Sequence, residues 1–295
     1  TYYPITLVRS IEFMNISLGW KLEEISMPKA ILVTGSTDGI GSETAKMLVS
    51  LGHNVLLHGR SPEKLESVEN TLSAISDGVR VESYVADLSS MADVEALAKA
   101  VSEKHAKLDV LINNAGVFNT PHPITQDGLD VRFAVNTIAP YLLTKRLLPL
   151  FEKSGRVINL SSAAQAPVDP EALVGRTKLS DNAAYAQSKL AITMWSRSMA
   201  LSLKDDGPAI IAVNPRSMLG SKMVKQAYGV TGGDLRIGAE ILVRAALSDE
   251  FAAASGMYFN NDTGQFAPPH PDALDTHKCE AIVRVIDAFL TKLKQ

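Results

Sequence analysis

Short apolar runs alternate with amphipathic segments along the chain from Lys29 onward. The runs are rich in aliphatic and β-branched residues, which is typical of strands, whereas the intervening segments carry apolar residues at helical spacing. The predicted strands cover residues 30–34, 54–58, 79–85, 108–112, 156–160, 209–213 and 257–259. The predicted helices cover residues 42–51, 62–74, 91–104, 129–151, 183–204, 235–246 and 279–292.

Continuous apolar strands that are separated by helices indicate a parallel sheet buried on both faces. Right-handed crossovers then produce a doubly wound α/β sheet, which is a Rossmann-like fold. No internal repeat, low-complexity run or linker divides this pattern. We therefore expect a single domain over residues 27–295, with about seven strands and helices on both faces of the sheet.

The first segment, TYYPITLVRSIEFMNISLGWKLEEIS, has no clear hydrophobic period. Arg9 and Glu12 interrupt any apolar stretch of the kind that a targeting peptide needs. The first predicted strand and the glycine-rich turn begin almost directly after Met27. We therefore predict that residues 1–26 are a leader or vector-derived segment outside the fold, and an intact native mass starting at Thr1 would contradict this.

Composition excludes several classes of protein. The chain has 295 residues, of which 46% are hydrophobic and 21% charged, with a formal net charge of -3 and a sequence pI near 6.1. Slight acidity offers no electrostatic attraction for nucleic acid or anionic membranes. No window approaches the about 18 apolar residues of a membrane span, so none is expected.

The cysteines and histidines of the sequence indicate the redox compartment and the prospects for a metal site. The single cysteine, Cys279, excludes an internal disulfide framework and is typical of a reducing compartment, so we expect a cytoplasmic protein. The six histidines are scattered and no thiolate cluster exists, so no metal site is expected. His58 is expected at a strand end, with nothing nearby that would make it a base for a nucleophile.

A glycine-rich stretch, TGSTDGIG at residues 34–41, separates the first predicted strand from the first predicted helix. Glycines at this place let the backbone turn sharply and approach a pyrophosphate, which the helix N-terminus then stabilises. The spacing Gly-x-x-x-Gly-x-Gly differs from the common dinucleotide fingerprint Gly-x-Gly-x-x-Gly. The position of the stretch nevertheless predicts a dinucleotide site.

This stretch resembles the TGxxxGxG motif of the short-chain dehydrogenase/reductase family. Further segments resemble the motifs of that family in the same order, namely ADL at 86–88, NNAG at 113–116, VNT at 135–137, GRVINLSS at 155–162 and YAQSK at 185–189. The resemblance spans roughly residues 29 to 262, and the combination of motifs is specific although each one alone is weak. The long interval between Ser162 and Tyr185 is more similar to the retinol-dehydrogenase-like and protochlorophyllide-reductase-like branches.

The resemblance implies a set of cofactor-binding residues at the carboxyl ends of the strands. These are Gly35, Ser36, Thr37, Asp38, Gly39, Ile40, Gly41, Arg60, Asp87, Leu88, Asn114, Ala115, Gly116, Tyr185, Lys189 and Pro215. The second strand ends HGRS, without the carboxylate that usually accepts a hydrogen bond from the ribose of NAD. The Arg60 guanidinium would instead suit a 2′-phosphate. NADP(H) is therefore predicted, with NAD(H) as the alternative, and Asp38 argues against NADP(H) because some NADP-using relatives carry a basic residue nearby.

Tyr185 and Lys189 lie one helical turn apart and so share a helix face. An ammonium about 4 Å from a phenol favours the phenolate by roughly 4 kcal/mol at an effective dielectric constant of about 20. The pair therefore suits a proton donor and acceptor that works near neutral pH.

The family resemblance implies that Tyr185 exchanges the proton of a carbonyl or alcohol, and that Ser162 hydrogen-bonds the same oxygen. It also implies that Lys189 tunes Tyr185 and holds the nicotinamide ribose, and that Asn136 holds a water linking Lys189 to solvent. Ser161 is the competing serine, because neighbouring strand residues face opposite sides and only one can face the site. The resemblance favours Ser162.

The sequence departs from the family pattern in two places. After the sixth predicted strand it reads NPRSMLGS from Asn214, so Arg216 replaces the usual glycine and Gly220 or Ser221 takes the place of the usual threonine. Arg216 is a candidate contact for a cofactor phosphate or an acidic substrate group. Residues 218–233 resemble the mobile substrate lid of the family and suggest a pocket that accepts apolar groups. Residues 166–183 form an insertion that either lines the substrate entrance or is a surface loop.

These features predict an NADP(H)-dependent oxidoreductase that interconverts a carbonyl and an alcohol on a small, partly apolar molecule. One alternative is an enzyme that reduces an activated carbon–carbon double bond. A second alternative, from another class, is a catalytically idle dinucleotide sensor or interaction module. Homo-oligomerisation, the physiological substrate and the direction of reaction are left open.

Overall fold

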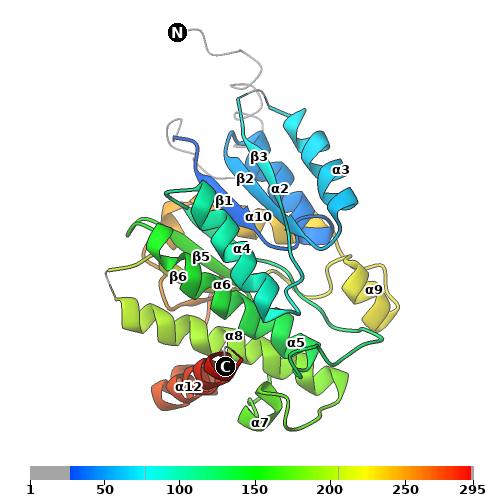
Figure 1. Ribbon diagram of the computed structural model, residues 1–295, viewed down its shortest axis with the longest axis vertical. Helices are drawn as coiled ribbons and strands as arrows, with labels where there is room; N and C mark the ends of the chain where they lie inside the picture. Colours follow the sequence, from blue (N-terminus) through cyan, green and yellow to red (C-terminus); the bar gives the residue numbers. More distant parts are fainter. Residues whose placement is uncertain (1–26, 77, 205, 294–295) are drawn as a thin grey trace.

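The computed structural model describes residues 27–76, 78–204 and 206–293. The predicted leader at residues 1–26 lies outside the described residues. Within the described part, eight strands form one sheet in the order β3-β2-β1-β4-β5-β6-β7-β8, and helices cover both of its faces (Figure 1). The predicted doubly wound α/β class is confirmed.

The strands lie close to the predicted apolar runs. They are β1 (Ala30–Val33), β2 (Asn54–Gly59), β3 (Val81–Val85), β4 (Val110–Asn113), β5 (Arg156–Leu160), β6 (Ala209–Asn214), β7 (Tyr258–Asn260) and β8 (Gln265–Phe266). β1 to β7 pair in parallel, and β8 pairs antiparallel with β7. β8 was not predicted because two residues are too few to show a period. Its Phe266 packs against Phe251 and Phe259.

The helices connect these strands. The longer ones are α2 (Gly39–Ser50), α3 (Pro62–Ser73), α4 (Met91–Lys104), α6 (Ala139–Leu147), α8 (Asp181–Leu203), α10 (Leu235–Leu247) and α12 (Thr276–Lys292). Short helical segments are α5 (Val131–Phe133), η1 (Ala134–Ile138), η2 (Leu148–Leu150), α7 (Pro170–Leu173), α9 (Lys222–Tyr228), η3 (Asp249–Phe251) and α11 (Pro271–Leu274). α7, α9 and α11 were not predicted, because each is too short for its period to be read from sequence.

Two hydrophobic layers hold the sheet between the helices. One layer joins the sheet to α4, α6 and α8, with α12 packed outside α8, and the other joins it to α2, α3 and α10 (Figure 1). Every residue of β5 and β6 is buried. The strands therefore read as continuous apolar runs because both faces of the sheet are covered.

The helix predicted at 129–151 is wrong as a single continuous element. It divides into α5, a π-helical turn η1, α6 and the 3-10 turn η2. Pro140 explains the break, because a proline donates no hydrogen bond and its ring crowds the carbonyl of Asn136, four residues earlier. In the π turn the N–H of Ala139 donates to the carbonyl of Ala134 instead.

Candidate active site

A cavity of about 730 Å³ lies at the carboxyl ends of the parallel strands. Its lining includes residues from the loops that follow β1, β2, β3, β4, β5 and β6. The strands β1 and β4 are neighbours in the sheet, but the chain continues from β1 to β2 on one side and from β4 to β5 on the other. A crevice therefore opens between the loops at the carboxyl ends of β1 and β4. The volume is within the range of roughly 300–1,000 Å³ that small-molecule sites occupy.

Most of the residues expected at a cofactor line this cavity. They are Gly35, Thr37, Asp38, Gly39, Ile40, Arg60, Asp87, Leu88, Asn114, Ala115, Gly116, Tyr185, Lys189 and Pro215. Ser36 and Gly41 do not line it, because both are buried behind the loop. Ser36 instead exchanges hydrogen bonds with the backbone of His58.

The glycine-rich loop is closely packed against the loop after β4. Gly35 and Gly39 have φ values of 66° and 58°, in the left-handed region that glycine adopts without strain. A Cβ on Gly41 would lie 2.2 Å from the carbonyl oxygen of Gly35 and 2.4 Å from Nδ2 of Asn114. That amide nitrogen donates to the carbonyls of Thr34 (2.8 Å) and Gly35 (3.1 Å). Glycine at 41 is thus required by close approach rather than by its backbone angles.

His58 belongs to this loop system, which the sequence analysis missed. Its Nδ1 accepts from the N–H of Gly35 at 3.1 Å, so its Nε2 carries the proton and donates to the carbonyl of Ala86 at 3.2 Å. Burial lowers the pKa of His58 to about 4, and the ring is therefore neutral at pH 7. His58 ties the loop after β1 to the loop after β3, and no sequence motif signals a contact between those segments.

Tyr185 and Lys189 project from α8 into the cavity. The Lys189 Nζ lies 5.8 Å from the centroid of the Tyr185 ring, so the two side chains are neighbours. Nζ donates to the carbonyl of Leu160 at the end of β5, at 2.8 Å. Burial lowers the pKa of Lys189 to about 8. A buried cation thus lies beside a phenol at the end of the fifth strand.

The two serines at the end of β5 have different environments. The Ser161 hydroxyl is buried and lies 2.7 Å from the Thr193 hydroxyl and 3.1 Å from the carbonyl of Lys189, to which it donates. Both serines line the cavity, but Ser162 is half-buried and its hydroxyl accepts from the N–H of Ala164 at 3.1 Å. The hydroxyl of Ser161 is thus engaged with α8, and that of Ser162 is the better placed for a ligand.

Asn136 lies in the π turn, and it is not among the residues that line the cavity. Its Oδ1 accepts from the N–H of Val117 at 2.8 Å, and its Nδ2 donates to the Val117 carbonyl and to Ser188 Oγ. The side chain therefore bonds protein groups rather than standing ready for a water. A Cβ on Gly116 would lie 3.5 Å from Asn136 Oδ1 and 3.7 Å from Lys189 Nζ, so the amide and the ammonium flank the same glycine.

Phe118 is a second residue that the sequence analysis missed. Its buried ring meets the Tyr185 ring edge-on, with centroids 4.8 Å apart. Arg132 is also buried, and its guanidinium donates to the Phe118 carbonyl and forms two hydrogen bonds with Asp130. It also pairs at 2.6 Å with Asp181 in the first turn of α8. The loop that carries Phe118 is therefore joined to the helix that carries Tyr185.

The loop after β6 has an unusual backbone. Arg216 and Met218 have φ values of 112° and 56°, which residues other than glycine rarely adopt. The Asp262 carboxylate holds this loop, accepting from the N–H of Ser217 at 2.8 Å and from Nδ2 of Asn214 at 2.8 Å. Burial opposes ionisation of Asp262, but these bonds and nearby Arg216 leave its pKa lowered. Arg216 is exposed and lines the cavity.

The lid segment, residues 218–233, closes on itself at its two ends. The N–H of Gly220 donates to the carbonyl of Gly233 at 2.7 Å, and the N–H of Gly233 donates to that of Met218 at 2.8 Å. Between these bonds, α9 stands out from the body of the molecule (Figure 1). Met218, Leu219, Ser221, Lys222, Met223, Val224 and Gln226 line the cavity.

The insertion at 166–183 does not line the cavity, although the structure describes all of it. Its buried Ala172 and Leu173 pack into the layer formed with α8 and α12. Gly175 lies so close to Gly128 that an added Cβ would meet the Gly128 carbonyl oxygen at 2.1 Å. The insertion is therefore a packed surface element, so of its two predicted roles the structure favours the surface loop over the lining of the entrance.

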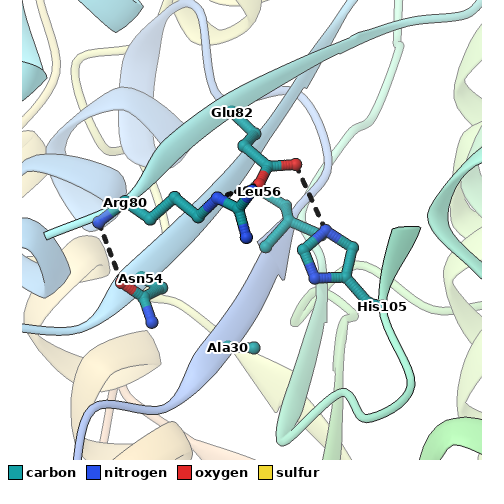
Figure 2. A pocket seen from close by; sticks show the side chains of 6 residues that line it. All are labelled: Ala30, Asn54, Leu56, Arg80, Glu82 and His105. Carbon is teal, nitrogen blue, oxygen red and sulfur yellow. Dashed lines mark hydrogen bonds and ion pairs between the residues drawn. The ribbon is translucent and has the colours of Figure 1, made fainter.

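A second cavity, of about 60 Å³, lies at the opposite, amino ends of β1, β2 and β3 (Figure 2). The Glu82 carboxylate there pairs with Arg80 at 2.6 Å and with His105 at 3.2 Å. Its volume is of the order of a few water molecules, and its charged groups are bonded to one another. This cluster therefore stabilises the sheet edge and offers no room for a dinucleotide.

Among the described residues, no helix combines the length and apolarity needed to cross a membrane. No group of three or more histidine, cysteine, aspartate or glutamate side chains within the same residues could hold a metal ion.

Comparison with known proteins identifies relatives of this chain. The short chain dehydrogenase family model matches residues 29–229, more than half of the chain. Human retinol dehydrogenase 13 is 32% identical over 266 residues, covering 84% of this chain and 80% of the relative. Human polyprenol dehydrogenase is 31% identical over 268 residues, covering 83% of this chain and 81% of the relative.

A solved structure shows the same fold with a nucleotide. The NADP complex of Pseudomonas aeruginosa RhlG superimposes with a TM-score of 0.65 at 25% identity, covering 80% of this chain and 96% of that one. The chain therefore belongs to the short-chain dehydrogenase/reductase family, in its retinol-dehydrogenase-like branch, and is a dehydrogenase/reductase that acts on a CH–OH or C=O group.

Proposed function

We propose that this protein is an NADP(H)-dependent oxidoreductase that interconverts an apolar alcohol and its carbonyl compound, using Tyr185, Ser162 and Lys189. The observation that carries the proposal is the placement of Lys189 Nζ beside the Tyr185 ring, in the same cavity as Ser162. A nicotinamide bound there would supply or accept the hydride.

Tyr185 is proposed to donate a proton to the carbonyl oxygen during reduction and to accept it during oxidation. The charge on Lys189 stabilises the tyrosinate that remains after donation. Ser162 donates a hydrogen bond to the same oxygen and so favours the charge that develops there. Burial of Lys189 strengthens this interaction, because water screens it less than at the surface.

Asn136 is proposed to act through its backbone rather than its side chain. Its side-chain amide bonds Val117 and Ser188. Pro140 has no N–H to donate to the Asn136 carbonyl, which therefore lacks its α-helical donor. This carbonyl is a suitable acceptor for a water that exchanges protons with Lys189.

The residues present fit a dinucleotide phosphate. Glycine at 35 and 39 leaves the backbone of the loop accessible at the cavity wall. Arg60 is exposed at the end of β2, where its planar guanidinium suits a 2′-phosphate. The NADP complex of the Pseudomonas aeruginosa relative adds support for this choice over NAD(H).

Apolar side chains form a large part of the cavity lining, and the ring of Phe118 contacts Tyr185. The others include Val131, Val135, Met218, Leu219 and Met223. Such a lining favours substrates with substantial hydrocarbon surface, and two relatives are named as retinol and polyprenol dehydrogenases.

A cytoplasmic location is proposed on the single buried, reduced Cys279.

The test is NADPH oxidation against a panel of apolar aldehydes, ketones and quinones, compared between wild type, Tyr185→Phe and the remote variant Tyr141→Phe. Loss of the proton donor should lower kcat by about 10²–10⁴-fold, whereas the dissociation constant of NADPH should change little. Tyr141→Phe should behave as wild type, since its hydroxyl contacts Asp287 on α12.

Three results would contradict the proposal. Full activity in Tyr185→Phe would remove the tyrosine from the chemistry. Nucleotide binding without consumption of any carbonyl substrate would favour the idle sensor, and reduction of an enone at carbon alone would favour the double-bond reductase.

A further inference from the structure

We propose that Lys222, on the lid helix α9, is a determinant of NADP(H) selectivity that is held at the 2′-phosphate end of the cavity by Asp38. This inference rests on the proposed function. It assigns a cofactor role to a residue of the segment 218–233, for which the sequence analysis expected contacts with substrate alone.

The contact joins two distant segments. Lys222 Nζ donates to Asp38 Oδ2, and the two residues are 184 positions apart. Both side chains line the cavity and both are exposed. The hydrogen bond from Lys222 is the largest cause of the lowered pKa of Asp38. The lid is thus connected to the glycine-rich loop by an ion pair at the cavity mouth.

The pair lies at the Arg60 end of the cavity. Thr37 packs against Gly59 so closely that a Cβ on Gly59 would meet Thr37 Cγ2 at 2.8 Å. Asp38 follows Thr37, and Arg60 follows Gly59. The lid cation is therefore held beside Thr37, at the part of the glycine-rich loop that packs against the end of β2, where Arg60 follows.

Asp38 alone would oppose a phosphate at this place, because like charges repel. Lys222 removes that repulsion by pairing with the carboxylate. The ammonium of Lys64, in the first turn of α3, adds a weaker attraction on the Asp38 carboxylate. The neighbouring acidic residue Glu63 accepts a hydrogen bond from the Ser61 hydroxyl. The acidic residue that argued against NADP(H) in the sequence thus acts as an anchor for a cation.

The ion pair is suited to exchange one partner for another. Pairs between exposed side chains contribute little free energy, so Lys222 can turn toward a dianionic phosphate at small cost. The hydrogen bonds of Gly233 with Gly220 and with Met218 restrict how far the lid can carry Lys222, which lies two residues after Gly220. Asp38 keeps the ammonium near the phosphate position before the nucleotide arrives.

The experiment measures dissociation constants of NADP⁺ and NAD⁺ by fluorescence titration of the full chain without substrate. The variants are Lys222→Met, the matched control Lys225→Met on the same helix, Arg60→Met and Asp38→Asn. Lys225 is exposed and is not among the cavity-lining residues.

Lys222→Met should weaken NADP⁺ binding about tenfold, the size expected for one hydrogen bond to a charged group. Binding of NAD⁺ should change less than about twofold, since it carries no 2′-phosphate. Lys225→Met should match wild type for both nucleotides. Asp38→Asn should weaken NADP⁺ binding less than Lys222→Met does, because it loosens the anchor of Lys222 but also removes a negative charge that opposes the phosphate.

The inference is overturned if Lys222→Met weakens NADP⁺ and NAD⁺ equally, or weakens neither. It is also overturned if Asp38→Asn loses as much NADP⁺ affinity as Lys222→Met. Wild-type protein without any preference for NADP⁺ would instead overturn the proposed cofactor. A preference that Arg60→Met abolishes and Lys222→Met leaves intact would retain the proposed cofactor and reject only the role of Lys222.

Discussion

The loops after β1 and β6 line the same cavity but are built in different ways. In the loop after β1, the left-handed backbone positions are glycines, Gly35 and Gly39, and Ser36 is fully buried. In the loop after β6, the corresponding positions are Arg216 and Met218, both exposed. The first loop satisfies its geometry with its own residue types, whereas the second adopts a backbone that its residue types disfavour.

Contacts from other segments hold the disfavoured backbone of the loop after β6. Asp262, from the loop between β7 and β8, accepts from both the N–H and the hydroxyl of Ser217. The hydrogen bonds of Gly233 with Gly220 and with Met218 then close the lid segment at its base. Backbone strain is common at ligand sites, where surrounding structure holds it. The comparison teaches that the glycine-rich loop adopts its left-handed positions without strain, whereas the loop after β6 needs contacts from outside to hold residue types that disfavour its backbone.

The largest effect is expected from Gly41→Ala in the glycine-rich loop. The added methyl would overlap the Gly35 carbonyl and the Asn114 amide. We expect a loss of about 3 kcal/mol in the free energy of unfolding and loss of nucleotide binding. Gly39→Ala is the control, since nothing lies within 4 Å of its Cβ and only the left-handed φ is strained, at about 1–2 kcal/mol.

Urea unfolding and NADP⁺ titration measure both variants. If Gly41→Ala were as stable as Gly39→Ala and bound nucleotide normally, the loop would be less closely packed than the structure shows, and the contrast with the lid would weaken.

The second effect is an acid sensitivity of the glycine-rich loop. The pKa of His58 is about 4 in the folded protein, below its ordinary value of 6.5. Between these values the unfolded chain binds more protons, so stability rises with pH and is lost on acidification from about 6.5 to 4. The loss amounts to roughly 3 kcal/mol for one fully shifted histidine. Protonation would also remove the acceptor for Gly35, so nucleotide binding should fall in the same pH window.

His53 provides a matched control, because burial lowers its pKa to about 4 as well. Its Nδ1 accepts from Lys29 at the start of β1, away from the cavity. His58→Gln and His53→Gln should each flatten the dependence of stability on pH. Only the former should alter nucleotide affinity at pH 7, and equal effects on affinity would contradict the role assigned to His58.

The smallest effect concerns the strained loop. Arg216→Gly relieves the positive φ and should stabilise the protein by about 1 kcal/mol, after the entropy that glycine adds to the unfolded chain. Arg216→Ala keeps the strain and removes the guanidinium. Thermal unfolding separates the variants, and equal melting temperatures would show that the strain is negligible. A matching loss of cofactor or substrate affinity in both would assign an anion to Arg216.

The pattern of the sequence determined the class of fold and the end of the sheet that carries the cavity. Apolar runs such as 156–160 and 209–213 predict strands buried on both faces, because every residue along them avoids water. The stretch at 34–41 indicates a phosphate loop because its glycines permit a local backbone turn. Tyr185 and Lys189 share a face because one helix carries both. These features depend on residues close together in the chain.

Only the tertiary structure decided the contacts between segments that are distant in sequence. It placed His58 beneath Gly35, Phe118 against Tyr185 and Lys222 on Asp38. It also packed the insertion at 166–183 away from the cavity and bonded the Asn136 side chain to Val117. Periodicity reports which face of an element is buried and does not report which neighbour covers it. The partner is decided by how the crossovers bring the strand ends together.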